Sequence, residues 1–288
     1  MIFLVLAVIC STGNQLLFKV FSRLHIDIFT AIVVNYAVCV LIGFGSAGPT
    51  VWPGAIFSQE WHFYSIVQGG MFVVCLVLLG LTTARRSVAM ASLATRLSVV
   101  IPTIAAFLLY GDVLTPFKIS GILASLMALY LSSSDRAGNK AQAANTPGML
   151  PLSLFIAYGL YAALLKFVQE KFLDGFSYHG YVLLSFLSAF LISAALLAWR
   201  LLKKKEACHW RDMLAGFVLG CSNYGAVYFL IRALGVPGWQ SSQIFPTVSI
   251  GIVSLSTLGA WIFFHEKLSR RLIWALAIGI GSIVLVNG

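Results

Sequence analysis

Charged side chains are scarce in this sequence: they make up 10% of 288 residues, and only nine of them are acidic. The longest polar segment runs from about Ser132 to Pro147. A soluble domain needs a polar surface, so the chain has no room for one. The nineteen Lys and Arg residues outnumber the acids. Basic loops of this kind are typical of contact with the cytoplasmic leaflet, so a lipid bilayer is the expected partner and nucleic acid is not.

Motifs that carry enzyme or metal chemistry are also missing. The five cysteines form no CxxC pair, and neither HExxH nor GxSxG occurs. The nine acids and the five histidines stand at the ends of apolar stretches or between them, and no Cys–His or His–Asp pair shares a depth. We therefore expect packing cysteines, no metal or cofactor, and no enzymatic activity.

Long apolar stretches dominate what is present. Hydrophobic residues make up 60% of the chain, and the mean hydropathy is +0.94. Apolar stretches of about twenty residues cross a hydrocarbon core of about 30 Å as helices, and a helix satisfies all of its backbone polar groups in lipid. The sequence predicts an all-α polytopic membrane protein with ten spans: 2–21, 28–46, 62–83, 87–110, 116–133, 149–169, 178–201, 212–233, 238–264 and 270–287.

The spans form two sets of five around a linker. Residues 134–148 are rich in Ala, Asn and Gly and have no periodicity, as linkers do. Five is an odd number, so the halves 1–133 and 149–288 enter the membrane in opposite orientations. This is the inverted-repeat plan of many secondary transporters, whose substrate site lies near the midplane between the halves.

The positions of the basic residues predict the orientation. Fourteen lie in the odd-numbered loops and four in the even-numbered loops. The odd-loop set is Lys19, Arg23, Arg85, Arg86, Arg136, Lys140, Arg200, Lys203, Lys204, Lys205, Arg211, Lys267, Arg270 and Arg271, and the even-loop set is Lys118, Lys166, Lys171 and Arg232. The positive-inside rule then predicts cytoplasmic odd loops and both termini outside. With minimal loops and no targeting segment, a bacterial inner membrane is the expected location.

A short motif that occurs once in each half marks the repeat. Leu108–Leu114 (LLYGDVL) ends the fourth span and Ile262–Leu268 (IFFHEKL) ends the ninth, each with an acid, one further residue and a Leu. In span number, linker position and this doubled motif the chain resembles the EamA-like members of the drug/metabolite transporter superfamily. The resemblance implies export or exchange of small metabolites through a central cavity. It also implies cytoplasmic termini, the reverse of what the basic residues predict, and Gly-Asp stands where the family commonly has Gly-Glu.

Arg96 is the clearest departure from apolar patterning, because it stands near the middle of the fourth span. A charge at mid-membrane costs about 2.5–3.5 kcal/mol on insertion scales, so it needs a partner or a water-filled cavity. A guanidinium suits a carboxylate or phosphate on a substrate. The structural alternative is an arginine that bonds the backbone carbonyls of a broken helix, and the functional interpretation is favoured.

Polar residues in other spans complete the predicted site. The expected substrate-binding residues are Arg96, Asn14, Asn35, Gln68, Tyr161, Asn223, Tyr224, Trp239 and Gln243, and the expected helix-break or gating residues are Pro102 and Pro246. Hydrogen bonding between helices is the ordinary alternative for such side chains. Snorkelling to the interface is favoured for Lys19 and Lys166, and their matching places in the two halves leave open a role at the two mouths of the cavity. Close packing explains Gly216-x-x-x-Gly220 and Gly121-x-x-x-Ser125.

These features favour a secondary transporter, working as a facilitator or exchanger, for a small polar metabolite that is anionic or zwitterionic, such as an amino acid. Alternating access around a midplane site is the expected mechanism. A scaffold or receptor subunit is the alternative, and a homodimer is compatible with either. A proton-coupled drug exporter is the second alternative, and it is disfavoured because the first span offers the neutral Asn14 and Arg96 would repel a cationic drug.

Overall fold

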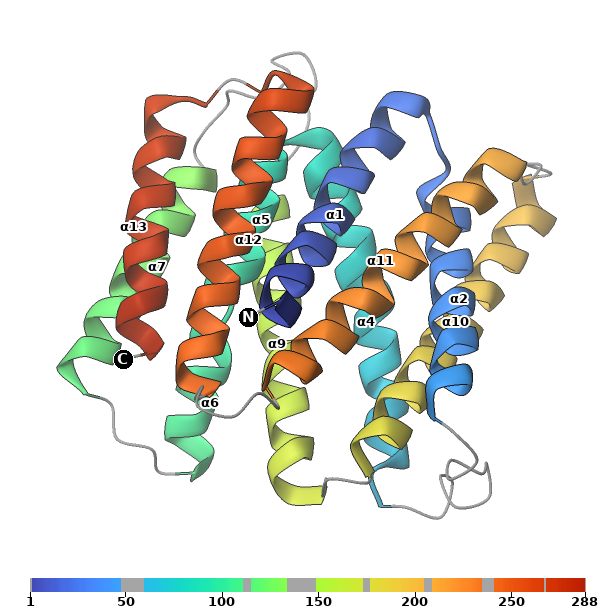
Figure 1. Cartoon of the computed structure of the whole chain (residues 1–288), viewed down its shortest axis with the longest axis horizontal. Coiled ribbons are helices and arrows are strands. Elements are labelled where there is room, and N and C mark those ends of the chain that lie inside the picture. The colour runs from blue at the N-terminus through green and yellow to red at the C-terminus, as the bar shows by residue number, and fades with distance from the viewer. Residues whose placement is uncertain are drawn as a thin grey trace. The chain divides into compact units, whose positions relative to one another are not determined.

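The computed structural model describes residues 2–47, 60–110, 115–133, 149–172, 177–204, 209–234, 241–266 and 268–287. Every regular element within these ranges is an α-helix (Figure 1). The helices are α1 (Ile2–Leu24), α2 (Ile28–Ala47), α4 (His62–Arg85), α5 (Val88–Leu97), α6 (Val100–Tyr110), α7 (Pro116–Ser133), α9 (Met149–Phe172), α10 (Ser177–Lys204), α11 (Trp210–Leu234), α12 (Ser241–Phe264) and α13 (Arg270–Asn287). The all-α prediction is confirmed.

The helices follow the predicted spans closely. Each predicted span coincides with one helix, or for 87–110 with the pair α5 and α6, and the ends differ by at most three residues. Among the described residues, six helices contain a stretch long and apolar enough to cross a membrane: α1, α2, α4, α9, α10 and α11. Shorter apolar helices cover 88–102, 116–131 and 248–264. The chain is a polytopic membrane protein.

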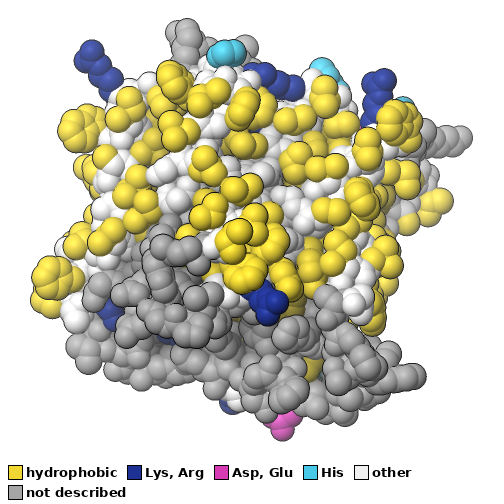
Figure 2. Space-filling model, viewed as in Figure 1, with side chains coloured by type: hydrophobic (Ala, Val, Ile, Leu, Met, Phe, Trp, Pro, Cys, Tyr) yellow, Lys and Arg dark blue, Asp and Glu magenta, His cyan; other side chains and the backbone are white. Residues whose placement is uncertain are grey.

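Large hydrophobic side chains cover much of the face seen in Figure 2. Over the whole described surface, Leu41, Leu108, Phe117 and Trp274 are among those with more than half of their surface exposed. Apolar patches of this extent are rare on monomeric soluble proteins, because they drive association in water. Lipid chains cover such a surface without cost, in agreement with the membrane assignment.

The fourth predicted span is divided into α5 and α6, which are separated by Ser98 and Val99. Pro102 explains the position of the break, because it has no N–H to donate to the carbonyl four residues earlier and its ring clashes with that carbonyl. The carbonyl in question belongs to Ser98. It accepts instead from the N–H of Ile101, at 3.0 Å, so the chain makes a tighter turn before α6 continues.

The helices form two compact units, and each unit takes helices from both halves of the chain. The first unit comprises Met1–Val20, Leu78–Leu160 and Gly225–Gly288. In it α13 packs along α7, while α12 packs on α5 (Figure 1). The hydroxyl groups of Ser125 in α7 and Ser282 in α13 lie 3.0 Å apart, so the looser small-residue motif of α7 is a packing site as predicted.

The second unit comprises Phe21–Val77 and Tyr161–Tyr224. In it α2 packs along α10 (Figure 1). The same helix lies against α11 through Gly216 and Gly220, where an added Cβ atom would stand 2.6 Å from the carbonyl oxygen of Ala31 and 2.8 Å from that of Asn35. The predicted packing role of this motif is confirmed. The repeat boundaries 1–133 and 149–288 stay a prediction, and the linker 134–148 lies outside the described residues.

Gly220→Ala should destabilise the protein by about 1–3 kcal/mol, because the new methyl group would overlap the carbonyl oxygen of Asn35. That oxygen can move only if the backbone of α2 moves with it. Gly281→Ala in α13 is the matched control, since nothing lies within 4 Å of its Cβ position. The control should unfold at the wild-type temperature or above it, because Ala favours helix over Gly. Thermal unfolding in detergent compares the two. Equal stability of the variants would contradict the close approach of α2 and α11.

Candidate functional site

Arg96 lies in the last turn of α5, beside the break in the fourth span. The other nine residues of this ten-residue helix are buried, and Arg96 is half-buried. The one charged side chain of α5 is therefore also the one with the largest solvent-accessible surface. The C-terminal end of a helix carries partial negative charge, which favours a cation there. This position serves both interpretations of Arg96, as a substrate contact and as a partner of free carbonyls.

Hydroxyl groups serve part of the backbone at this end of α5. The hydroxyl of Thr95 donates to the carbonyl of Ser92 at 2.9 Å, and that of Ser98 donates to the carbonyl of Thr95 at 2.7 Å. The carbonyl of Ser92 lies inside the helix, whereas that of Thr95 belongs to the last turn. The Ser98 hydroxyl therefore satisfies one of the carbonyls that a helix leaves open at this end.

Asn35 in α2 and Asn223 in α11 are brought together in the second unit. The Nδ2 atom of Asn223 donates to Oδ1 of Asn35 at 3.2 Å. Asn35 has no exposed surface, and its own Nδ2 atom has no hydrogen-bond partner among the described residues. A buried donor left without a partner costs about 1–3 kcal/mol. A polar ligand or water at this position would recover that free energy.

Gln68 in α4 is a second buried amide with unused capacity. Its side chain is 1% exposed, and neither Oε1 nor Nε2 has a hydrogen-bond partner among the described residues. One turn later, the ring of Phe72 packs on Tyr161 and on Tyr36, with centroids 5.4 Å and 6.4 Å apart. The predicted residue Tyr161 thus belongs to an aromatic cluster in the same unit as Gln68.

The remaining predicted residues are distributed between the units. Asn14 is buried in α1 and belongs to the first unit, while Tyr224 is half-buried in α11 and belongs to the second. Pro102 is buried in the first turn of α6, and α12 continues as a helix through Pro246. Trp239 and the side chain of Gln243 lie outside the described residues. The binding and gating roles of the whole set stay predictions.

Lys19 forms an ion pair with a residue from the other half of the chain. Its Nζ atom lies 2.7 Å from Oε1 of Glu266, and the two side chains are 17% and 11% exposed. The ammonium group of Lys19 thus has a carboxylate partner at a span end, which the sequence did not predict. The sequence placed both residues near span ends, but no sequence signal joined them to each other.

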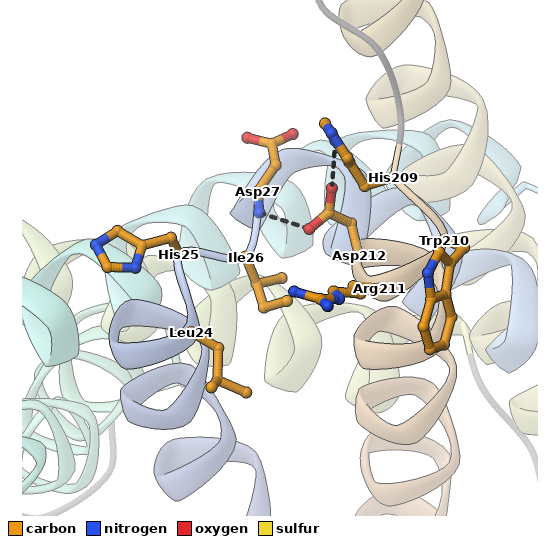
Figure 3. A pocket seen from close by; sticks show the side chains of 8 residues that line it. All are labelled: Leu24, His25, Ile26, Asp27, His209, Trp210, Arg211 and Asp212. Atoms are coloured by element: carbon orange, nitrogen blue, oxygen red, sulfur yellow. Dashed lines mark hydrogen bonds and ion pairs between the residues drawn. The ribbon is translucent and has the colours of Figure 1, made fainter.

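A pocket of about 590 Å³ lies at the ends of α1 and α11, lined by Leu24–Asp27 and His209–Asp212 (Figure 3). The carboxylate of Asp212 is buried and accepts from the backbone N–H of Asp27 at 3.0 Å. Asp27 in turn accepts from the N–H of Thr30 at 3.0 Å, and its other oxygen accepts from Nη1 of Arg200 at 2.7 Å. Both carboxylates thus accept hydrogen bonds from groups of the protein itself. The signal for this arrangement was an acid three residues before Thr30, at the start of an apolar stretch.

Within the described ranges, no group of three His, Cys, Asp or Glu side chains is arranged to hold a metal ion.

No family model matches the sequence. A protein of Haemophilus influenzae, described as an uncharacterized protein, is 24% identical over 273 residues, which are 93% of this chain and 91% of that protein. A protein of known crystal structure has a similar fold, with a TM-score of 0.60 and 16% identity over 99% of this chain and 94% of that one. The first likeness makes this chain a distant homologue of the Haemophilus protein, and the second shows the fold alone.

Asp27 should make stability depend on acid pH. Burial by itself raises the pKa of a carboxyl group, but the hydrogen bonds from Arg200 and Thr30 and the charge of Arg200 outweigh it and hold the Asp27 pKa below its ordinary value. A carboxylate whose pKa is lower in the folded state stabilises the fold above its unfolded pKa, about 3.9. That contribution is lost as the pH falls through the folded pKa.

Asp27→Ala should cost about 0.5–2 kcal/mol at pH 7, because the start of α2 loses its cap. Asp27→Asn keeps a capping oxygen for the Thr30 N–H, but it loses the charge and the second oxygen that accepts from Arg200. Its deficit in unfolding temperature should therefore shrink as the pH is lowered through the acid range, while the difference between the two variants persists. Thermal unfolding in detergent at a series of pH values measures both. A deficit of the Asn variant that does not change with pH would contradict the role of the charge.

Proposed function

We propose that the protein is a secondary transporter, a facilitator or exchanger, for a small polar metabolite with an anionic or zwitterionic group, such as an amino acid. The observation that carries the proposal is the interrupted fourth span, in which the only residue of α5 that is not buried is Arg96. An interrupted membrane helix with a polar end is a common way to build a solute site at depth.

The length of α5 supports a site near the midplane. Ten residues at 1.5 Å each rise about 15 Å, which is half of a hydrocarbon core of about 30 Å. Arg96 stands in the last turn of this helix. A charge at that depth is costly unless it meets water or an opposite charge. A solute carboxylate or phosphate meets the requirement with a bidentate bond.

The unused amide groups of the second unit support a polar solute. Gln68 and the Nδ2 atom of Asn35 are buried without hydrogen-bond partners among the described residues. Scaffold proteins gain nothing from such groups, because each one lowers stability. This observation favours the transporter over a non-transporting scaffold or receptor subunit. A transporter that binds and releases a polar solute needs them.

The architecture suggests alternating access between two inverted five-span halves, as in the EamA-like members of the drug/metabolite transporter superfamily. The contacts at span ends support this span count. In the first unit, Glu266 contacts Lys19 and Val88, and all three residues stand at odd-numbered loops. In the second unit, Asp27 pairs with Arg200, and these two residues also stand at odd-numbered loops. Odd-numbered loops must lie on one side of the membrane if the count is right.

We assign that side to the cytoplasm, because it carries most of the basic residues. Both termini then lie outside, in a bacterial inner membrane. A reporter enzyme that is active only in the cytoplasm should be inactive when it is fused after Gly288, and active when it is inserted between Lys203 and Trp210. The reverse pattern would contradict the orientation and leave the span count intact.

Purified protein in liposomes should exchange one class of labelled solute from a pool of amino acids, organic acids and sugars. Solute loaded on the opposite side should accelerate the exchange, and collapse of a pH gradient should leave it unchanged. Cationic-drug flux that disappears with the gradient would contradict the proposal, as would the absence of flux from every pool.

Arg96→Ala should insert and fold, and it should lose exchange of the anionic solute by about tenfold or more, because a charged hydrogen bond contributes about 1.5–3 kcal/mol. Arg96→Lys should retain part of the activity, since it keeps the charge but not the planar fork. The matched control is Arg85→Ala, at the exposed end of α4. Wild-type exchange by the Arg96→Ala variant would assign Arg96 a structural role.

A further inference from the structure

The N-terminus of α5 is held by two side chains from different parts of the first unit. Ser87 is the N-cap residue, and its hydroxyl accepts from the N–H of Met90 at 3.0 Å. The carboxylate of Glu266 accepts from the N–H of Val88, with Oε2 at 3.2 Å and Oε1 at 3.4 Å. Two of the N–H groups that a helix start leaves open are thus satisfied. The negative charge also suits the positive end of the helix.

A turn after α12 brings Glu266 to this place. His265 has a φ of 52°, in the left-handed region, and the next N–H, that of Glu266, donates to the carbonyl of Ala260 at 3.2 Å. A left-handed residue at a helix end reverses the chain, and a residue other than glycine adopts it only where its surroundings require it. Apolar packing fixes the same region, since Met90 of α5 lies in one buried cluster with Leu272 of α13.

Lys19 completes the arrangement from α1. Its Nζ atom stands 2.7 Å from Oε1 of Glu266, and both side chains are largely shielded from solvent. The carboxylate therefore has a cation on one side and the start of α5 on the other. A shielded carboxylate without these partners would be strongly unfavourable, so the three groups depend on one another.

We infer that Glu266, held by Lys19, is a positioning residue that sets where α5 presents Arg96. Nine of the ten residues of α5 are buried, so the place of this helix depends on its contacts with the residues around it. The Lys19–Glu266 pair holds one end of α5, and Arg96 stands at the other. The inference rests on the proposed function, because it gives the pair its purpose in solute binding.

Transport variants test the inference in liposomes with a solute that the wild type exchanges. Glu266→Ala should raise the half-saturating solute concentration about tenfold or more, because small misplacements of a binding group cost that much. Glu266→Gln keeps an acceptor for the Val88 N–H and should have a smaller effect. Glu60→Ala, at an exposed acid before α4, is the control and should behave as wild type. A wild-type half-saturating concentration in Glu266→Ala would overturn the inference.

A charge swap separates capping from pairing. Lys19→Glu with Glu266→Lys restores an opposite-charge pair, but it directs an ammonium group at the start of α5, where only an acceptor fits. The swap should therefore not restore solute affinity. Full restoration would show that the pair alone suffices and would overturn the capping part of the inference.

A measurement without transport distinguishes the inference from the proposed function. Arg96→Cys, in a chain whose five native cysteines are replaced by alanine, is labelled with a membrane-impermeant thiol reagent. Adding Glu266→Ala should change the labelling rate about threefold or more, because the rate follows the access of position 96. An unchanged rate would overturn the inference even if solute exchange is found. A changed rate with no exchange by any variant would keep the positioning role and reject the transporter.

Discussion

The N–H groups at a helix start have no partner inside the helix, and Thr30 and Val88, at two helix starts of this protein, are buried from solvent. At the start of each of these two helices, a carboxylate accepts from a backbone N–H and also forms an ion pair with a lysine or arginine from a distant part of the chain. Asp27 accepts from Thr30 at the start of α2 and pairs with Arg200. Glu266 accepts from Val88 at the start of α5 and pairs with Lys19. Each unit is thus joined at its span ends by one acid that serves a helix and a cation together.

Both acids follow a histidine in the left-handed region. His25 has a φ of 55° and His265 a φ of 52°, and they are the only residues other than glycine with positive φ among those described. The first ends α1 two residues before Asp27, and the second ends α12 directly before Glu266. The chain reverses at these points, so the acids leave the helix that precedes them and reach other segments. The strained backbone at His25 and His265 therefore places the carboxylates that cap α2 and α5.

The amino-acid sequence predicted the spans well, because twenty apolar residues allow few alternatives in lipid. It also predicted the packing role of Gly216 and Gly220, and it named Pro102, which explains the break between α5 and α6. It did not predict the partners. Asn35 and Asn223 were both predicted site residues, but their mutual hydrogen bond depends on the packing of α2 against α11. The pairing of Lys19 with Glu266 was missed for the same reason, since apolar helices carry little information about their neighbours.

The contact between Glu266 and the start of α5 can form only late in biosynthesis. Val88 and Glu266 are 178 residues apart, so α5 leaves the ribosome long before its carboxylate partner is made. Until then Lys19 and the open end of α5 have no shared acid, and nothing from the end of the chain fixes the helix that carries Arg96. A nascent chain with only its first half inserted therefore lacks the carboxylate that caps α5. The order of synthesis itself delays the complete anchoring of α5 until almost the whole polypeptide is present.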